Sequence, residues 1–218
     1  MFLTRLEPND QAALKALGTR RRYPAGAMLF FAGDRADELM IVLDGDVKVH
    51  VGTIDGRDVI LDVMGEGELL GELSALDGLP RSAEATALTQ LEVVAISNKR
   101  FLEFVQHHPQ VLFQLTVDLA TRLRTTTRHN VEFGAGDALG RLSSRLLEVA
   151  ERFGAQQLDG TVRVESPVTQ ADLAAWTGLS REAVVKGLRA LRALGWIENQ
   201  GKTITVLDPA KLEARAAR

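Results

Sequence analysis

Between Tyr23 and Ser97 the chain consists of short β-rich runs that are separated by glycines. The runs read AMLFFA, ELMIVLDG, DVKVHVG, DVILDVMG, SAEATAL and LEVVAIS, and the stretch VKVHV alternates as a half-buried strand does. Many short strands with glycine turns are typical of a β-sandwich or a rolled barrel. The pattern predicts an all-β domain, and residues 5–17 before it read as a short amphipathic helix.

One run inside the β pattern, GELSALDGLPRSA, carries groups suited to a phosphate ligand. Glu72 offers a carboxylate that can accept a hydrogen bond from a ribose 2′-OH, and Arg81 offers a planar charged fork for phosphate oxygens. A glycine lets the backbone approach a ligand, a serine adds a hydroxyl, and the start of the helical turn expected over residues 72–76 favours an anion. These features predict a pocket for the cyclic phosphodiester of a ribonucleoside; its candidate residues here are Gly71, Glu72, Leu73, Arg81 and Ser82. The alternative is a surface ion pair between Glu72 and Arg81.

From Lys99 onward the period becomes helical. We expect a short helix over residues 99–107, and Pro109 suits the first turn of a longer one. The longer helix carries a stripe with steps of 4, 3, 4, 3, 4 and 3 residues, which is a heptad seam. Its members are Leu112, Thr116, Leu119, Leu123, Thr126, Asn130 and Phe133. The seam predicts a homodimer through this helix, and packing of the stripe on the chain's own β-domain is the alternative.

Two short helices joined by a tight turn are expected near the C-terminus. Thr169 is a good N-cap with Asp172 at the capping-box position, and Ser180 caps the second helix, SREAVVKGLRALRALG. The segment WIENQGKTITVLD then reads as a hairpin with its turn at Gly201. A second helix with basic residues near its start predicts a helix-turn-helix that binds DNA. A three-helix bundle for protein contacts is the alternative.

These runs carry a resemblance to a known family. GEL-x3-DG-x-PRSA resembles the phosphate-binding cassette of the cyclic-nucleotide-binding domain, and TQADLA-x2-TGLSREAV-x2-GLRALRALGWI resembles a winged-helix reader. The whole chain is similar to the Crp/Fnr family of bacterial regulators, closest to its cyclic AMP receptor protein type. The resemblance implies an α+β fold. Its expected parts are a jelly-roll β-roll (double-stranded β-helix) over residues 1–108, a dimerisation helix over 109–133, a hinge at 134–137 and a winged helix-turn-helix DNA-binding domain over 138–218.

The resemblance also assigns residues to double-stranded DNA. Arg181 and Glu182 correspond to the family's base readers, which agrees with arginine pairing to guanine and a carboxylate accepting from cytosine N4. Lys186 stands where the cyclic AMP receptor protein type has arginine, so either the base preference differs there or the lysine binds a phosphate. The remaining positions are implied backbone contacts, which position the protein without reading sequence; they are Thr169, Gln170, Ser180 and Arg189.

The expected ligand also follows from the resemblance. Adenine is read in the family by two hydroxyl residues of the long helix, one from each subunit, and the matching positions here are Thr126 and Thr127. The implied allosteric ligand is 3′,5′-cyclic AMP. Cyclic GMP, cyclic di-GMP and a ligand-independent regulator of the same fold remain alternatives, and the two threonines can also be ordinary polar residues of a coiled coil. RNA polymerase is a further expected partner, with Arg20–Arg22 and residues 155–163 as candidate contacts.

Composition and motif content exclude several classes of cofactor site and of protein function. The absence of cysteine excludes disulfides, thiolate zinc sites and iron–sulfur ligation, and none of the four histidines has a recognisable haem-ligand context. We find no P-loop, metal cluster or serine–histidine arrangement, so no enzyme is expected. No apolar run approaches a membrane span and no signal peptide is evident, which predicts a cytoplasmic protein without a membrane partner. A cyclic-nucleotide-binding subunit of a kinase or channel is a further alternative, but such a protein would lack the DNA-recognition helix expected within residues 168–207.

Charge is distributed unevenly. Residues 134–218 hold 12 Lys/Arg and 10 Asp/Glu, a net charge of +2, whereas residues 1–133 carry −5. A mildly acidic sensor and a mildly basic reader are compatible with DNA binding, because local basic clustering matters more than the total charge.

Overall fold

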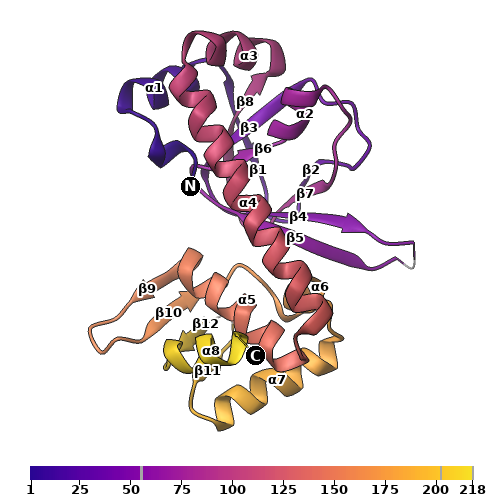
Figure 1. Ribbon diagram of the computed structural model, residues 1–218, viewed down its shortest axis with the longest axis vertical. Helices are drawn as coiled ribbons and strands as arrows, with labels where there is room; N and C mark the ends of the chain where they lie inside the picture. The colour runs from indigo at the N-terminus through magenta and orange to yellow at the C-terminus, as the bar shows by residue number, and fades with distance from the viewer. Residues whose placement is uncertain (55, 202, 218) are drawn as a thin grey trace. The chain divides into compact units, whose positions relative to one another are not determined.

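The computed structural model describes residues 1–54, 56–201 and 203–217 (Figure 1). The chain divides into two compact units: the first comprises Met1–Gly52 and Leu61–Thr125, and the second comprises Thr53–Ile60 and Thr126–Arg218. Strand β5 (Asp58–Met64) and helix α4 (Pro109–Ala135) contribute residues to both units.

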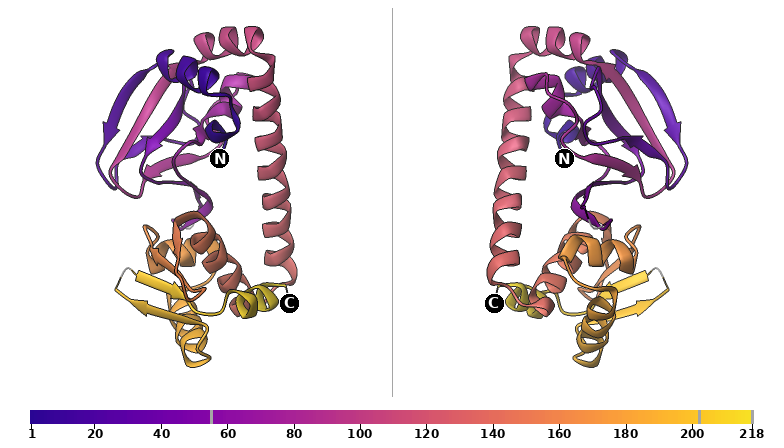
Figure 2. Two further views of the ribbon diagram at one scale, coloured as in Figure 1. Left: turned by 90° about the vertical axis from the view of Figure 1, so that its left-hand side faces the viewer. Right: turned by 90° about the vertical axis from the view of Figure 1, so that its right-hand side faces the viewer.

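The first unit is built on two four-stranded sheets, which Figure 2 shows face to face. One sheet has the order β1-β8-β3-β6, with strands at Thr19–Tyr23, Leu91–Ser97, Glu38–Asp44 and Leu69–Leu70. The other has the order β2-β7-β4-β5, with β2 at Met28–Phe30, β7 at Glu84–Ala87 and β4 at Val47–Gly52. The predicted β-roll is confirmed.

Strand β3 explains how this unit forms its core. Leu39 and Ile41 pack with the helices, whereas Met40 and Val42 pack with residues of the opposite sheet. Successive side chains of a strand point to opposite faces, so a strand that is buried on both faces reads as an unbroken apolar run. This is why ELMIVLDG shows no polar alternation.

Helices cover the outer face of the β1-containing sheet. They are the 3₁₀ helix η1 (Leu3–Arg5), α1 (Pro8–Ala16), α3 (Asn98–His107) and the first turns of α4, while α2 (Glu72–Asp77) follows β6. The helix expected over residues 5–17 is therefore shorter than predicted. It begins at Pro8, whose missing N–H and fixed φ suit the first helical position.

Strand β1 was not expected from the sequence, because TRRRY has no alternating apolar residues. It pairs with β8 as an edge strand, and its arginines form ion pairs along it: Arg20 and Arg22 with Glu92 at 3.0 and 2.8 Å, and Arg21 with Glu38 at 2.5 Å. The basic run is therefore an ion-paired charged surface. Exposed pairs of this kind contribute little to stability.

The second unit is a winged helix-turn-helix, which confirms the predicted C-terminal fold. Its helices are α5 (Ala138–Phe153), α6 (Gln170–Thr177), α7 (Arg181–Ala193) and α8 (Pro209–Ala216). Its sheet has the order β11-β12-β10-β9, with strands at Ile197–Gln200, Thr203–Val206, Val162–Glu165 and Gly154–Gln156. β11 and β12 form the predicted wing, although Lys202 in its turn lies outside the described residues.

Side-chain caps fix where these helices begin, as the sequence predicted. Asp137 accepts a hydrogen bond from the Gly140 N–H at 2.8 Å, and Ser180 accepts one from the Ala183 N–H at 3.2 Å. Thr169 and Asp172 form a complete capping box. Only Gly136 and Asp137 separate α4 from α5.

Asp46 provides a test of the energetics of the β-roll. Burial, together with the nearby carboxylates of Asp44 and Glu68, raises the pKa of Asp46 to about 6 from its ordinary 3.8. A raised carboxyl pKa means that ionising the group costs folding free energy above pH 6, and that this cost disappears as the pH falls toward 4. We expect Asp46→Asn to raise the free energy of unfolding at pH 7.5 by about 1 kcal/mol, after discounting for solvent screening.

Urea denaturation of both proteins at pH 7.5 and pH 4 checks this prediction. The gain should be present at pH 7.5 and absent at pH 4. Asp37→Asn is the matched control, because the Asp37 side chain is 74% exposed and its change should alter stability by less than about 0.5 kcal/mol. A gain of equal size at both pH values would contradict the assignment.

Candidate functional site

The predicted ligand-binding run forms a tight loop and short helix between β6 and β7. Gly71 has a left-handed φ of 79° and precedes α2, which ends at Asp77 and has Gly78 as its C-cap. A Cβ atom built on Gly71 would lie 1.8 Å from Nη1 of Arg81. The position therefore requires glycine both for its backbone conformation and for the close approach of the Arg81 guanidinium.

Arg81 is held in place by backbone carbonyls. Its side chain is buried, Nη1 donates to the Gly71 carbonyl at 3.1 Å, and Nη2 donates to the Glu38 carbonyl at 2.5 Å. The guanidinium carbon lies 4.3 Å from the centroid of the Phe30 ring. Burial lowers the pKa of Arg81, but an arginine remains a cation.

Two features of Arg81 suit an anionic ligand. No carboxylate forms an ion pair with its guanidinium among the described residues, and its buried Nε atom has no hydrogen-bond partner there. A buried cation with an unused N–H is costly unless an anion or another acceptor completes it. The residues present therefore fit a phosphate group.

Glu72 is also buried, and its partner is on α4. The side chain is 5% exposed and its carboxylate contacts Nη1 of Arg122 at 3.1 Å. Burial raises the pKa of Glu72, and the charge of Arg122 opposes that rise. In the described part of the chain Glu72 thus pairs with Arg122 and not with Arg81, so the alternative of an ion pair between Glu72 and Arg81 is wrong.

Arg122 is a residue of this site that the sequence analysis missed. It also donates to the Leu69 carbonyl at 3.3 Å and pairs with Asp118 at 3.0 Å. Fifty residues separate it from Glu72, and the only signal available was the need for a cation near a buried carboxylate.

The other predicted pocket residues are solvent-accessible. Leu73 is 44% exposed on α2, and Ser82 is exposed one residue after Arg81. Thr126 and Thr127 are exposed on α4 and belong to the second unit. The roles of these four residues in ligand binding remain predictions.

The seam predicted along α4 is exposed at all of its positions except Leu119. Leu112 and Leu123 are 40% and 68% exposed, whereas Leu119 packs against the core of the first unit. Phe133 is 42% exposed, although a Cβ on Gly178 would come within 2.7 Å of its ring and the Arg141 guanidinium lies 5.6 Å from its centroid. Leu119 is thus the one member of the seam that is not exposed, so the predicted seam stays accessible along its length.

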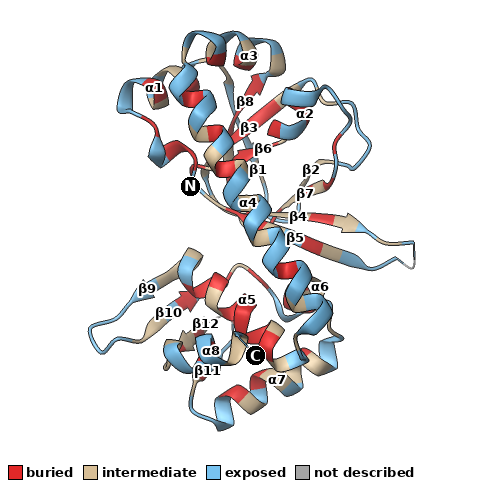
Figure 3. Ribbon diagram, viewed as in Figure 1, coloured by how far each residue is buried: buried red, intermediate tan, exposed pale blue. Residues whose placement is uncertain are grey.

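The predicted DNA-reading helix α7 has one buried and one exposed face. Val184, Leu188 and Leu191 are buried. The residues predicted to contact bases or phosphates lie on the exposed face; they are Arg181, Glu182, Lys186 and Arg189. In Figure 3 exposed segments of α7 contrast with the largely buried α5.

Local hydrogen bonds hold two acidic side chains near the starts of α6 and α7. The Glu182 carboxylate accepts hydrogen bonds from its own backbone N–H and from the Ser180 hydroxyl, which lower the pKa of Glu182, so this carboxylate stays an acceptor at neutral pH. The Thr169 hydroxyl contacts the Asp172 carboxylate at 2.6 Å, and Gln170 beside it is exposed.

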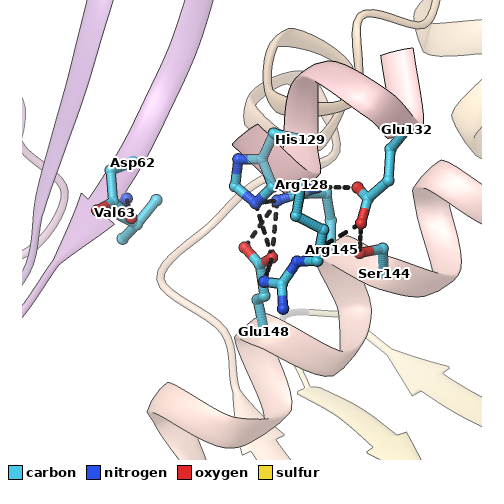
Figure 4. Close-up of polar contacts among 8 residues, drawn as sticks. All are labelled: Asp62, Val63, Arg128, His129, Glu132, Ser144, Arg145 and Glu148. Carbon is cyan, nitrogen blue, oxygen red and sulfur yellow. Dashed lines mark hydrogen bonds and ion pairs between the residues drawn. The ribbon is translucent and has the colours of Figure 1, made fainter. Parts of the chain in front are cut away.

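A charge cluster that is largely buried except at Arg128 joins the end of α4 to α5 (Figure 4). We call it the α4–α5 charge cluster; it comprises Arg128, His129, Glu132, Ser144, Arg145 and Glu148. Arg145, 2% exposed, contacts both Glu148 carboxylate oxygens at 2.8 Å and also bonds Glu132. His129 Nε2 lies 2.9 Å from Glu148.

Two searches of the described residues bear on other classes of site. They contain no group of three or more His, Asp or Glu side chains arranged to hold a metal ion. No helix among them has both the length and the apolar content needed to cross a membrane.

Comparisons with known proteins agree with this architecture. Residues 20–108 match the cyclic nucleotide-binding domain, and residues 140–215 match the Crp-like helix-turn-helix domain. The chain is 35% identical over 211 residues to the CRP-like cAMP-activated global transcriptional regulator of Mycobacterium tuberculosis, covering 97% of this chain and 94% of that protein. It is 31% identical over 191 residues to the cAMP-activated global transcriptional regulator Vfr of Pseudomonas aeruginosa, covering 86% and 88%.

A solved structure with the same fold is the c-di-GMP responsive global regulator CLP of Xanthomonas campestris. It superposes with a TM-score of 0.79 at 28% identity, over 92% of this chain and 99% of that one. The chain therefore belongs to the CRP family of transcriptional regulators, with a cyclic nucleotide-binding domain followed by a Crp-like helix-turn-helix domain that binds DNA.

Proposed function

We propose that the chain is a homodimeric regulator that binds palindromic DNA operators in response to 3′,5′-cyclic AMP. The ligand assignment depends mainly on the buried guanidinium of Arg81. Among the described residues, no carboxylate forms an ion pair with this group, and its Nε atom has no hydrogen-bond partner. The two relatives of this chain described above, from Mycobacterium tuberculosis and Pseudomonas aeruginosa, are named as cAMP-activated regulators. We propose that the chain acts by binding alone, in the cytoplasm where its operators lie.

The chain's own residues have distinct roles in this proposal. Arg81 holds the cyclic phosphate, since a guanidinium can donate two parallel hydrogen bonds to it. Glu72, held by Arg122, accepts from the ribose 2′-OH. Thr126 and Thr127 offer hydroxyls to adenine; Thr126 follows Arg122 by four residues, one turn further along α4.

Dimerisation is supported by the exposed part of α4. Leu112, Phe113 and Leu123 are 40%, 64% and 68% exposed, and exposed apolar side chains on one helix favour association. A two-fold dimer would present two α7 helices to successive major grooves, about 34–36 Å apart.

RNA polymerase contact is a less direct part of the proposal. The arginines of β1 are occupied by Glu38 and Glu92, which weakens their candidacy. The hairpin of β9 and β10 is better suited, because Leu158 near its tip is fully exposed.

Cyclic di-GMP is the second candidate ligand, since CLP, which shares the fold, is described as c-di-GMP responsive. One experiment distinguishes the two. Duplexes selected from a random library with the full chain and cyclic AMP are then titrated by fluorescence anisotropy without ligand and with cyclic AMP, cyclic GMP or cyclic di-GMP.

Cyclic AMP should tighten binding to the selected duplex by about 5- to 150-fold, the usual range for allosteric coupling. A response to cyclic di-GMP alone would replace the ligand assignment. Equal affinity under all conditions would show a ligand-independent regulator and refute the proposal.

A further inference from the structure

One apolar side chain lies among the charged residues of the exposed face of α7. Val185 follows Arg181 by four residues and precedes Arg189 by four, so the three lie on one ridge of the helix. Val185 is partly exposed, whereas Val184 beside it is buried. The core of the second unit therefore buries the neighbouring valine completely, whereas part of the Val185 side chain stays accessible between the two arginines.

A valine is not the residue that helix stability would select here. β-Branched side chains lose rotamer freedom in a helix, so helix propensity alone would favour alanine, lysine or glutamate at this partly exposed position. Its apolar surface needs an apolar partner to contribute free energy. On the face that meets DNA, the apolar group that base edges offer in the major groove is the C5-methyl of thymine.

We propose that Val185 is a specificity-determining residue that contacts the C5-methyl group of a thymine in each operator half-site. This rests on the proposed DNA-binding function. Arg181 and Glu182, one turn earlier on α7, are suited to guanine and cytosine, so Val185 extends base reading to an adjacent A·T pair. The contact is apolar and needs no hydrogen bond from the base.

Replacement of thymine by uracil isolates this contact. Uracil keeps the O4 acceptor and the Watson–Crick edge of thymine and lacks only the C5-methyl. Each thymine of the selected operator is replaced in turn, symmetrically in both half-sites, and the dissociation constants of the full chain for the thymine and uracil duplexes are measured by anisotropy with saturating cyclic AMP.

Wild-type protein should lose affinity at one thymine position, by about 4-fold per methyl group and about 15-fold for both half-sites. Val185→Ala should bind the thymine and uracil duplexes equally, and Val185→Thr, which has a similar shape, should keep part of the preference. Leu194→Ala is the matched control, because Leu194 is 52% exposed on the opposite side of the helix end and its change should leave the ratio unchanged.

The outcomes separate this inference from the proposed function. If wild-type protein binds its operator but no uracil substitution weakens it, the inference is wrong and DNA binding stands. The inference is equally wrong if Val185→Ala keeps the wild-type ratio while its circular dichroism spectrum is unchanged. If no duplex is bound selectively, the DNA-binding function fails and the inference with it.

Discussion

Arg81→Leu is expected to abolish the response of operator binding to cyclic AMP while leaving the ligand-free affinity for DNA unchanged. A phosphate that binds to Arg81 gains charge-assisted hydrogen bonds, each worth about 1.5–3 kcal/mol. Loss of two such bonds should weaken cyclic AMP binding by at least about 100-fold. Isothermal calorimetry with cyclic AMP and anisotropy with the operator measure the two effects separately.

Controls are needed because Arg81 also donates to the Gly71 and Glu38 carbonyls. Arg81→Lys keeps the charge and removes the planar fork, so it should bind cyclic AMP more weakly than wild type but more tightly than Arg81→Leu. Arg20→Leu removes an arginine that is 71% exposed and should change nothing. A cyclic AMP response that survives in folded Arg81→Leu would contradict the pocket assignment.

Arg145→Met should lower the free energy of unfolding by about 3–5 kcal/mol, because removing one partner of a buried ion pair leaves an uncompensated charge. Arg145 is 2% exposed, contacts both oxygens of Glu148 and lies 5.8 Å from the ring of Trp176. The Trp176 environment should therefore report the change, and urea denaturation followed by tryptophan fluorescence measures it.

Arg128→Met is the matched control, since Arg128 contacts the same carboxylate at 3.0 Å but is 58% exposed. Its cost should be below about 1 kcal/mol. Equal losses in the two variants would show that burial does not set the strength of the α4–α5 charge cluster.

The pH dependence gives a second check on the same cluster. Burial alone would raise the pKa of Glu148, but the His129 hydrogen bond and the charges of Arg145 and Arg128 outweigh burial and lower it below 4.5. A lowered carboxyl pKa contributes stability that is present above pH 4.5 and is lost as the pH falls below that value. The difference between wild type and Arg145→Met should therefore shrink in acid.

The features predicted correctly from the sequence are those that a short stretch of chain determines. The Thr169–Asp172 capping box and the Asp137 and Ser180 caps need only residues three positions apart. Local chemistry was enough for these caps. The sequence also indicated a close backbone approach at Gly71, which the structure shows toward the Arg81 guanidinium, while the ligand contacts of Gly71 and Arg81 stay predictions.

The features that were missed depend on contacts between distant residues. Strand β1 forms by pairing with β8, which is distant in the sequence, and its arginines then meet Glu38 and Glu92. The sequence TRRRY has no apolar alternation that would predict an edge strand. Arg122 joins the site only once α4 packs on the β-roll. Helix α8 packs on α5, yet its own Asp208 cap and Pro209 were a signal that could have been used.

The central claim is that cyclic AMP and operator DNA bind to one coupled system. Cyclic AMP is titrated calorimetrically into the full chain alone and into the chain already bound to its selected operator. Coupling free energies are reciprocal, so the operator should tighten cyclic AMP binding by the same factor by which cyclic AMP tightens operator binding. Identical cyclic AMP affinities with and without operator, or no binding heat in either titration, would contradict the account.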